Sequence, residues 1–513
     1  MDALDRNVAT AILGLDTLWG GDVLNPSGTG RFIADSWFSD EPLPASYPCP
    51  EAARMRAAGG VSAKPEAVAA LDAYLAAVDV RGAVASLRDE AGRGEGLRAR
   101  YLEGLGFCFE VMLDLALEVA GRGEPVPYER CMRAILGRPG SPSDPASKRE
   151  RVRELLAAAD LPSTDGPGLL AAVDAWRAAR IVPKPEIPAL SERFVADLDA
   201  LTARNVMPFL PVELAGVPRA NVTFLPIENA WFSGSMNYLG RARRSDGSPE
   251  YEATYELNAS LEISRPEFAQ LVSHEVVPGH VTTFAFLQNL FVRGVLGFEA
   301  SVLTMNTRPA ALFEGIANNA ILMAHGVLSP EELPDRDLEA GALLALLQDD
   351  AKNQSSWLTW NEGWPREGVA RVLRNDYLVS EERADKLSGA WGRHPLLGRM
   401  YLPAYRAGTE KVAELRRKYP REKVLPVLFG CRGVWFQVAN DPWGRNTAEG
   451  YGWSACWKRR AVLILPGFQD RMCCPMHCSY GSSPSPFRLS NSPLSCSLPR
   501  YGGPSSCFPN WCP

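Results

Sequence analysis

Residues 274–280, with the sequence HEVVPGH, constrain the fold more than any other part of the chain. They place two of the five histidines and one carboxylate within seven residues. An α-helix turns by about 100° and rises by about 1.5 Å per residue. A regular helix would therefore rotate His280 by roughly 240° from His274 and displace it by about 9 Å along the axis, so the two rings would point apart.

Pro278 and Gly279 predict a break between the two histidines. Proline lacks the N–H that a helix needs and clashes with the carbonyl group four residues earlier, which here belongs to His274. Glycine tolerates backbone conformations that are closed to other residues. We therefore expect the helix to end or bulge at Pro278 and to restart near His280, turning the two imidazoles toward each other. Bulges of the π type are common at functional sites.

The residues before this motif predict a capped helix beside a small sheet. Residues 264–267, Ser-Arg-Pro-Glu, have the pattern of a capping box with proline in the first turn of the helix. Residues 251–264 alternate strictly between apolar and polar side chains, which predicts a half-buried strand. Residues 222–227 are a second strand candidate, and Pro226 within them favours an edge position. The alternative is that the motif is a loop whose histidines are ordinary buried polar groups.

The HExxPGH pattern resembles the signature of a bacterial family of unknown function, usually written HExxPGHH and regarded as gluzincin-like zinc metallopeptidases. The resemblance covers roughly residues 190–420. It implies one zinc ion held by His274, His280 and a downstream glutamate, with Glu275 as the general base. The chain departs from the signature at Val281, where the family has a second consecutive histidine. His280 must therefore be the ligand.

Glu314, in the sequence FEGIA, resembles the EGxA segment of the family and is the expected third ligand. Pro309 suits the first turn of a helix, and apolar residues recur at helical spacing from there to a C-terminus near His325. Glu299 is the alternative ligand, because its separation from His280 is also found in some gluzincin families. Either glutamate could instead be a solvated helix residue, the commonest state of this residue type.

The resemblance also implies a mechanism. A zinc ion with three protein ligands leaves a fourth position for water and lowers the pKa of that water toward about 7. Glu275 takes the proton and returns it to the leaving nitrogen, while a nearby donor stabilises the oxyanion. Tyr405 is the first choice for this donor, because Tyr405 and Gly408 match a tyrosine and a glycine that recur late in the family. Residues 399–401 are Arg-Met-Tyr where the family usually has Pro-Gly-Gln. The alternative donors are Tyr401, Arg406 and His394.

The remaining sequence divides into three regions by composition and periodicity. Residues 1–205 are an N-terminal helical region, and residues 206–430 are the metallopeptidase-like catalytic region. Helical periodicity predicts eight further helices, at residues 64–78, 96–120, 147–159, 168–180, 189–204, 338–352, 365–374 and 396–418. The fold class is therefore mainly α, a large helical domain with a small antiparallel sheet beside the gluzincin-like HExxPGH helix.

Residues 431–513 form a tail of different composition. Eight of the eleven cysteines lie in it, and residues 472–513 contain only two charged side chains among many serines, prolines and glycines. Such a segment buries too little apolar surface to offset its conformational entropy, so we expect disorder. A disulfide-rich secreted module is the alternative, but no signal peptide is found. We hypothesise a frameshifted or alternatively spliced end, which transcript sequencing tests.

Composition narrows the functional classes. A net charge of −6 and a pI of about 5.7 give no reason to expect nucleic acid as a partner. The absence of a long apolar run predicts no membrane span, and the acidic N-terminus predicts a cytoplasmic protein. We therefore expect a zinc-dependent hydrolase that cleaves a peptide or a small amide substrate. The alternative is a noncatalytic peptide-binding or scaffold protein of the same fold. Oligomeric state and substrate preference stay open.

Overall fold

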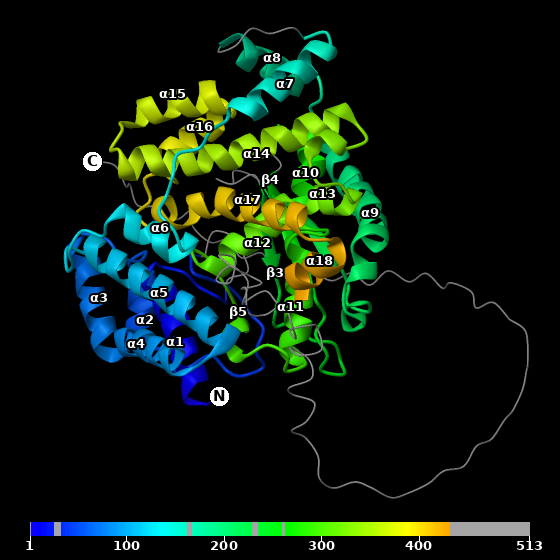
Figure 1. Ribbon diagram of the computed structural model, residues 1–513. Helices are drawn as coiled ribbons and strands as arrows, with labels where there is room; N and C mark the ends of the chain where they lie inside the picture. The colour runs from blue at the N-terminus through cyan, green and yellow to red at the C-terminus, as the bar shows by residue number, and fades with distance from the viewer. Residues whose placement is uncertain (1, 25–31, 162–166, 228–233, 259–261, 431–513) are drawn as a thin grey trace, which may run out of the picture. The chain divides into compact units, whose positions relative to one another are not determined.

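The first six helices gather around one apolar core, at the lower left of Figure 1. The computed structural model describes residues 2–24, 32–161, 167–227, 234–258 and 262–430, so the tail predicted at residues 431–513 lies outside the described residues. The core also includes Ala311 and Ala404 from the region at residues 206–430. The six helices are α1 (Ala3–Leu18), α2 (Pro50–Ala57), α3 (Pro65–Ala77), α4 (Val80–Arg93), α5 (Gly96–Val119) and α6 (Tyr128–Leu136).

The next three helices pack elsewhere. α7 (Ala146–Ala158) and α8 (Pro167–Ala178) share a second apolar core with α14 (Arg336–Ser356), in which Trp176 and Leu347 are fully buried. α9 (Ile187–Asn205) lies against α10 (Arg265–Glu275) and α13 (Ala320–His325). The region predicted at residues 1–205 is thus divided among three places, and all of them belong to the compact unit Met1–Pro442.

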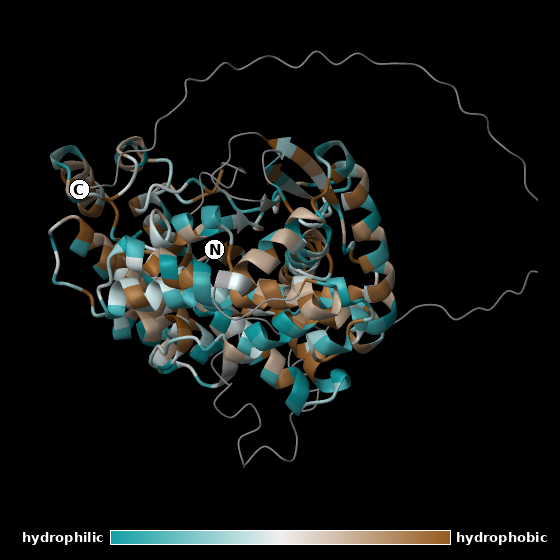
Figure 2. Ribbon diagram, turned by 90° about the horizontal axis from the view of Figure 1, so that it is seen from above, coloured by the Kyte–Doolittle hydropathy of each residue, from teal (hydrophilic) through white to brown (hydrophobic). Residues whose placement is uncertain are grey.

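Helices α12, α17 and α14 cross the centre of this unit one above another (Figure 1). The contact between α12 and α17 depends on two glycines, because a Cβ on Gly315 would overlap the Gly408 backbone and a Cβ on Gly408 would overlap the carbonyl of Ala311. Along most helices in Figure 2, hydrophobic and hydrophilic residues alternate, as expected where one face is buried. The remaining helices of the described residues are α11 (His280–Val292), α12 (Arg308–Asn318), α15 (Arg366–Tyr377), α16 (Glu381–Ser388), α17 (Leu402–Lys418) and α18 (Arg421–Gly430).

Short helical turns connect these elements. Two of them are π-helical, η7 (Trp357–Asn361) and η8 (Leu397–Tyr401). The others are the 3₁₀ turns η2 (Lys184–Glu186), η3 (Met207–Phe209), η4 (Val212–Leu214), η5 (Phe298–Ala300) and η6 (Pro330–Glu332). Within the described ranges no single helix is long and apolar enough to cross a membrane, although the bent pair Arg308–Asn318 and Ala320–Glu332 meets the length and composition requirement.

The predicted small sheet lies directly before the motif helix in sequence. Its strand order is β2 (Val222–Ile227), β4 (Ala253–Asn258) and β3 (Gly234–Tyr238). β3 pairs antiparallel with β4, whereas β2 joins the other side of β4 in parallel, at the edge that Pro226 predicted. β4 begins later than the alternating pattern at residues 251–264, because Tyr251 adopts a left-handed backbone (φ 55°). Residues 259–261 of the pattern lie outside the described residues.

A second, two-stranded sheet has no counterpart among the predictions. β1 (Ala34–Trp37) pairs antiparallel with β5 (Val302–Thr304), and the register shifts between Ala34 and Ser36. The Ser36 hydroxyl donates to the backbone carbonyl of Tyr238 in β3, at 2.9 Å. This contact ties the N-terminal part of the chain to the sheet beside the motif helix.

Candidate metal centre

Helix α10 ends and α11 begins around a tight turn, which is the break that the motif predicted. The Gly279 N–H donates to the Ser273 carbonyl at 3.1 Å, and the Thr282 N–H donates to the Val276 carbonyl at 3.2 Å. Each bond reaches six residues back instead of the four of an α-helix, so the backbone absorbs the two extra residues of the motif. The Val277–Pro278 peptide bond is cis, and this turn takes the place of the expected π-type bulge.

Gly279 is required at its position in the turn. A Cβ there would overlap the carbonyl oxygen of His274, which is backbone and cannot move aside. This close approach of the backbone brings the two rings together. The ring centroids of His274 and His280 are 4.8 Å apart, and the ring planes are nearly perpendicular. Imidazoles that a straight helix would separate are therefore neighbours.

Glu314 of α12 faces both histidines. Its Oε2 atom lies 3.4 Å from His274 Nε2 and 3.7 Å from His280 Nε2. The same oxygen is buried and has no hydrogen-bond partner among the described residues. Two atoms bound tetrahedrally to one zinc ion, at about 2.0–2.2 Å each, are roughly 3.3–3.6 Å apart. The observed separations and the partnerless oxygen both fit a small cation held by these three residues.

Two carboxylates compete for the role of third ligand. The Glu275 carboxylate also lies with the ring nitrogens of His274 and His280, all within 4.8 Å of one another. However, Glu275 Oε1 is 3.9 Å from His274 Nε2, farther than Glu314 Oε2. Glu314 is also the more buried of the two. We therefore favour Glu314 as the ligand, which leaves Glu275 beside the same point and free to exchange a proton.

A half-buried amide orients the first histidine. His274 Nδ1 lies 2.7 Å from Asn318 Oδ1, and the Asn318 side-chain N–H donates to the Thr409 hydroxyl at 2.9 Å. In this orientation the Asn318 oxygen accepts from the ring, so Nδ1 of His274 carries a proton. Histidine ligands of metals are typically held in this way at the nitrogen that does not bind the ion.

Aromatic packing orients the second histidine. The His280 ring stacks on Phe284, with centroids 5.3 Å apart and an angle of 23° between the planes. Phe284 in turn contacts Phe313 and Tyr238 edge to face. His280 Nδ1 is buried without a hydrogen-bond partner among the described residues. The position of this ring therefore depends on packing rather than on hydrogen bonding.

Two tyrosines lie on the far side of Glu314. The Tyr401 hydroxyl donates to Glu314 Oε1 at 2.6 Å, and the Tyr405 hydroxyl donates to the Tyr401 oxygen at 3.0 Å. Burial and the neighbouring Glu314 charge hold the pKa of both phenols well above the ordinary value, so both hydroxyls keep their protons. Tyr405, the predicted oxyanion donor, is two hydrogen bonds from Glu314, and its catalytic role stays a prediction.

The electrostatics of the cluster favour a positive charge at its centre. Burial lowers the pKa of His274, but the adjacent Glu314 carboxylate and the charge of Glu275 outweigh burial and raise it. Burial raises the pKa of Glu314, but the two histidines outweigh burial and hold it well below the ordinary value. An ionised carboxylate beside two imidazoles is the donor set that zinc prefers.

The other candidates from the sequence lie elsewhere. Glu299, the alternative ligand, binds the Arg98 guanidinium through both carboxylate oxygens at 2.8 Å. Arg406 binds Glu410 and backbone carbonyls of residues 141–142. His394 packs against two aromatic rings and accepts two backbone N–H groups, and burial lowers its pKa to about 4. Neither Arg406 nor His394, two of the alternative donors, therefore contacts the cluster.

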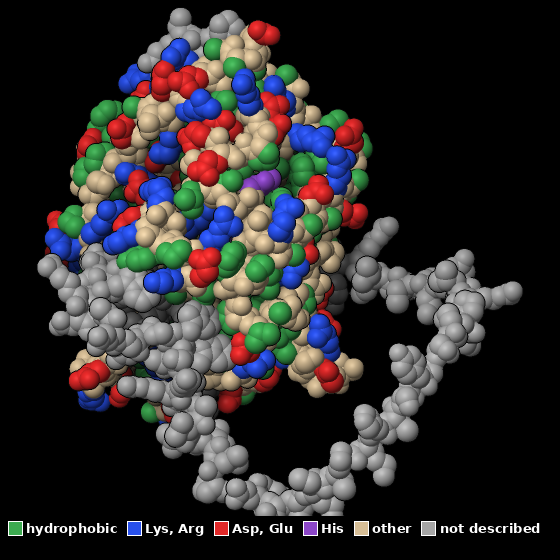
Figure 3. All heavy atoms as spheres, turned by 45° about the vertical axis from the view of Figure 1, so that its right-hand side comes forward, with side chains coloured by type: hydrophobic (Ala, Val, Ile, Leu, Met, Phe, Trp, Pro, Cys, Tyr) green, Lys and Arg blue, Asp and Glu red, His purple; other side chains and the backbone are tan. Residues whose placement is uncertain are grey.

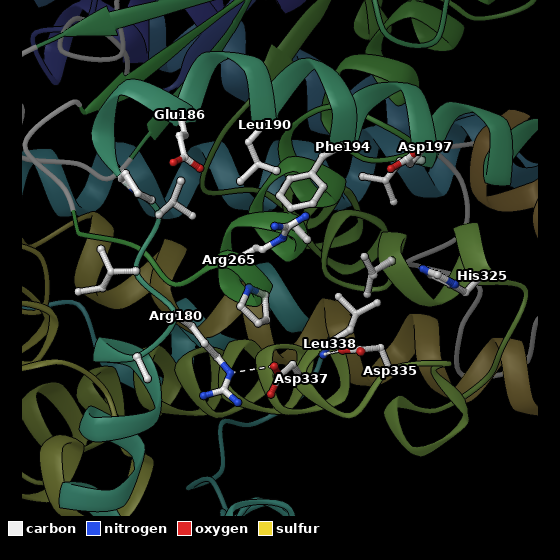
Figure 4. A pocket seen from close by; sticks show the side chains of 18 of the residues that line it. Arg180, Glu186, Leu190, Phe194, Asp197, Arg265, His325, Asp335, Asp337 and Leu338 are labelled. Carbon is white, nitrogen blue, oxygen red and sulfur yellow. Dashed lines mark hydrogen bonds and ion pairs between the residues drawn. The ribbon is translucent and has the colours of Figure 1, made fainter. Parts of the chain in front are cut away.

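A separate cavity of about 710 Å³ lies at the opposite end of α10 (Figure 4). The residues that line this cavity are mainly apolar and include Leu190 and Phe194. Arg180 and Asp337, which also line it, form an ion pair at 2.8 Å. None of the clustered histidines and glutamates lines it. On the face shown in Figure 3, acidic and basic side chains are interspersed and no region of one sign dominates.

Comparison with known proteins gives structural likenesses but no family. No family model and no curated protein matches the chain. The fold is similar to that of a candidate lipoprotein from Colwellia psychrerythraea, with 14% identity, 70% of this chain and 66% of that chain covered, and a TM-score of 0.46. It is also similar to a candidate lipoprotein of unknown function from Shewanella oneidensis, with 13% identity, coverage of 75% and 77%, and a TM-score of 0.44. The chain thus spans about two thirds of the first of these proteins.

Sequence reasoning named Tyr401 and Tyr405 only as oxyanion donors, and it missed Asn318 and Thr409, which also support the cluster. Asn318 follows Glu314 by four residues, and Tyr401, Tyr405 and Thr409 are spaced by four, so each set shares one helix face. That spacing is the signal that was available. It is weak in isolation, because the same spacing also occurs on solvated helix faces.

Proposed function

We propose that this chain is a zinc-dependent hydrolase of peptide bonds or related amide bonds. The observation that carries the proposal is the approach of His274 Nε2 and His280 Nε2 to one partnerless carboxylate oxygen of Glu314. Supporting features are the glycine that permits the turn and the half-buried Asn318 amide that orients His274. Such a buried, unsatisfied set is costly unless a cation completes it.

The roles of the residues follow from their positions. His274, His280 and Glu314 would hold the ion, which supplies a Lewis acid at the scissile carbonyl and a water of lowered pKa. Glu275 lies beside the ligands without being the nearest carboxylate, so it can accept a proton and return it to the leaving nitrogen. Tyr401 holds the outer oxygen of Glu314 and so directs the other oxygen inward. Tyr405 is the proposed oxyanion donor, and in this role its single hydroxyl proton would turn from Tyr401 toward the substrate oxyanion.

A zinc analysis combined with one substitution tests this function. We expect one zinc per purified chain. We also expect hydrolysis of peptides from a mixed library, with the products detected by mass spectrometry. Glu275→Gln should keep the zinc but lower kcat by about 10²–10⁴-fold, the range for loss of a general acid–base group. Glu314→Gln should lose the zinc itself.

Glu299→Gln is the matched control, because Glu299 is a buried glutamate that pairs with Arg98 instead of the histidines. It should keep both zinc and activity. Full activity of Glu275→Gln would contradict the hydrolase mechanism. Zinc bound without hydrolysis of any peptide or amide would favour the noncatalytic peptide-binding alternative.

A further inference from the structure

A buried ion pair on α14 lies behind the candidate centre. Lys352 Nζ is 3.2 Å from Asp349 Oδ1, and both residues are at most 9% exposed. Burial raises the pKa of Asp349 and lowers that of Lys352, and each charge opposes the shift of its partner. Desolvation makes such a pair a weak contributor to stability. Its contacts toward the site indicate a different role.

The first set of contacts leads from Asp349 to His274. The Thr409 hydroxyl lies 3.1 Å from Asp349 Oδ2 and 2.8 Å from the Tyr405 carbonyl, and both are acceptors. The Thr409 proton is therefore directed toward one of them, which turns a lone pair of its oxygen toward Asn318. The Asn318 amide must then present its N–H to Thr409 and its oxygen to His274.

The second set leads from Lys352 to Glu314. Lys352 Nζ lies 3.2 Å from the centroid of the Tyr405 ring, a cation–π contact. A cation on the ring face withdraws electron density from the phenol and strengthens its hydroxyl as a donor. That hydroxyl donates to Tyr401, which donates to Glu314 Oε1. The two sets of contacts start from one ion pair and end at two different ligands.

We propose that the Asp349–Lys352 pair positions two of the three metal ligands, His274 through Thr409 and Asn318, and Glu314 through Tyr405 and Tyr401. The inference rests on the proposed metal centre. Asp349 and Lys352 are positioning residues, because neither touches the ligands themselves. The pair sets how well the free protein is arranged for the ion.

Zinc affinity of the full-length protein, measured by competition with a chromogenic chelator, tests the inference. The main variant is Asp349→Asn with Lys352→Met, which removes both charges and leaves no unpaired ion in the interior. The introduced amide can still accept from Thr409, so this variant chiefly weakens the contacts to Glu314. Thr409→Val interrupts the contacts to His274, and Thr409→Ser restores the hydroxyl. Circular dichroism confirms that each variant is folded.

The neighbouring pair Asp350–Lys148 is the matched control. It is an aspartate–lysine pair whose aspartate lies on the same helix, 2.8 Å apart, with Asp350 buried, and it contacts none of the ligands. Asp350→Asn with Lys148→Met should leave zinc affinity within about three-fold of the wild type. A purely structural role for the Asp349–Lys352 pair would lower the thermal stability of its variant without changing zinc affinity.

We expect zinc to bind about ten-fold more weakly, or worse, to the Asp349→Asn/Lys352→Met variant and to Thr409→Val, the usual range for groups behind a metal ligand. Thr409→Ser should return to within about three-fold of the wild type. Tight zinc binding by the wild type and by both folded variants would overturn this inference alone. Absence of zinc from the wild type would overturn the proposed function as well.

Discussion

Two of the three candidate ligands are held at the atom that faces away from the proposed ion, and the third is held by ring stacking. Asn318 holds Nδ1 of His274, Tyr401 holds Oε1 of Glu314, and Phe284 stacks on His280. A side chain fixed on its outer side loses little freedom when the ion binds, so these contacts favour tight binding. The sequence predicted His274 and His280 from the motif and Glu314 from its resemblance to the EGxA segment. It did not predict that Asn318 contacts His274, because that contact depends on how α10 and α12 pack.

Tyr405 gives a test at the scale of one hydroxyl. In protein saturated with zinc, Tyr405→Phe should lower kcat by about 10²–10³-fold if its hydroxyl stabilises the oxyanion. Zinc content must be measured in the same sample. Tyr377→Phe is the control, because its hydroxyl also donates a hydrogen bond, to the Ser143 carbonyl, but away from the site. A kcat unchanged in both variants would remove Tyr405 from the mechanism.

At the scale of elements, periodicity predicted most helices to within a few residues, because the apolar residues of one helix face recur at helical spacing within a short stretch of sequence. Residues 96–120, for example, correspond to α5, and residues 189–204 to α9. The helix expected from Pro309 to His325 is interrupted at Asn319. The pairing of β1 with β5 was not predictable, because it joins short strands that are far apart in sequence.

The glycine contact between α12 and α17 also gives a test. Gly408→Ala places a methyl group against the Ala311 carbonyl, so the two helices must separate. We expect the free energy of unfolding to fall by about 1–3 kcal/mol. Zinc should also bind more weakly, because α12 carries Glu314 and α17 carries Tyr405. Denaturant titration and chelator competition measure the two effects.

The control for Gly408 is Gly92, which lies in α4 with open space where a Cβ would be. Gly92→Ala should raise the free energy of unfolding by about 0.5–1 kcal/mol, because alanine loses less conformational entropy in a helix. Equal effects of the two alanines would mean that the α12–α17 contact has no special requirement for glycine.

At the scale of the whole molecule, the proposed centre joins three consecutive helices to two elements that lie farther along the chain and to α14. His274, His280 and Glu314 come from α10, α11 and α12, and the supporting side chains come from α11, α12, α14, η8 and α17. These helices belong to one compact unit with the N-terminal helices, Met1–Pro442. The motif alone could not predict which helices would surround it.

The N-terminal part of this unit contains a buried acid that should make stability depend on pH. Burial raises the pKa of Asp16 from 3.8 to about 6, although bonds from the Ala34 and Ile33 N–H groups oppose the rise. Between these pH values the folded state binds more protons than the unfolded state. The contribution of Asp16 to stability is therefore fully present below about pH 4 and is lost as pH rises through 6, about 3 kcal/mol in all.

Asp16→Asn should flatten this part of the pH dependence. Asparagine keeps an oxygen for the two N–H groups, and Tyr47, which now donates to Asp16 at 3.1 Å, can donate to Asp22 instead. Urea unfolding at several pH values between 4 and 7 gives the difference between wild type and variant. A constant difference across that range would contradict the raised pKa.

Zinc K-edge X-ray absorption of the zinc-loaded protein measures directly whether His274, His280 and Glu314 hold the ion. We predict that the zinc ion has only nitrogen and oxygen neighbours. These are two imidazole nitrogens and one carboxylate oxygen at about 2.0–2.2 Å, together with one exchangeable light atom. Glu314→Gln should remove the carboxylate contribution. Sulfur neighbours at about 2.3 Å would instead place the ion on some of the eleven cysteines and contradict the account.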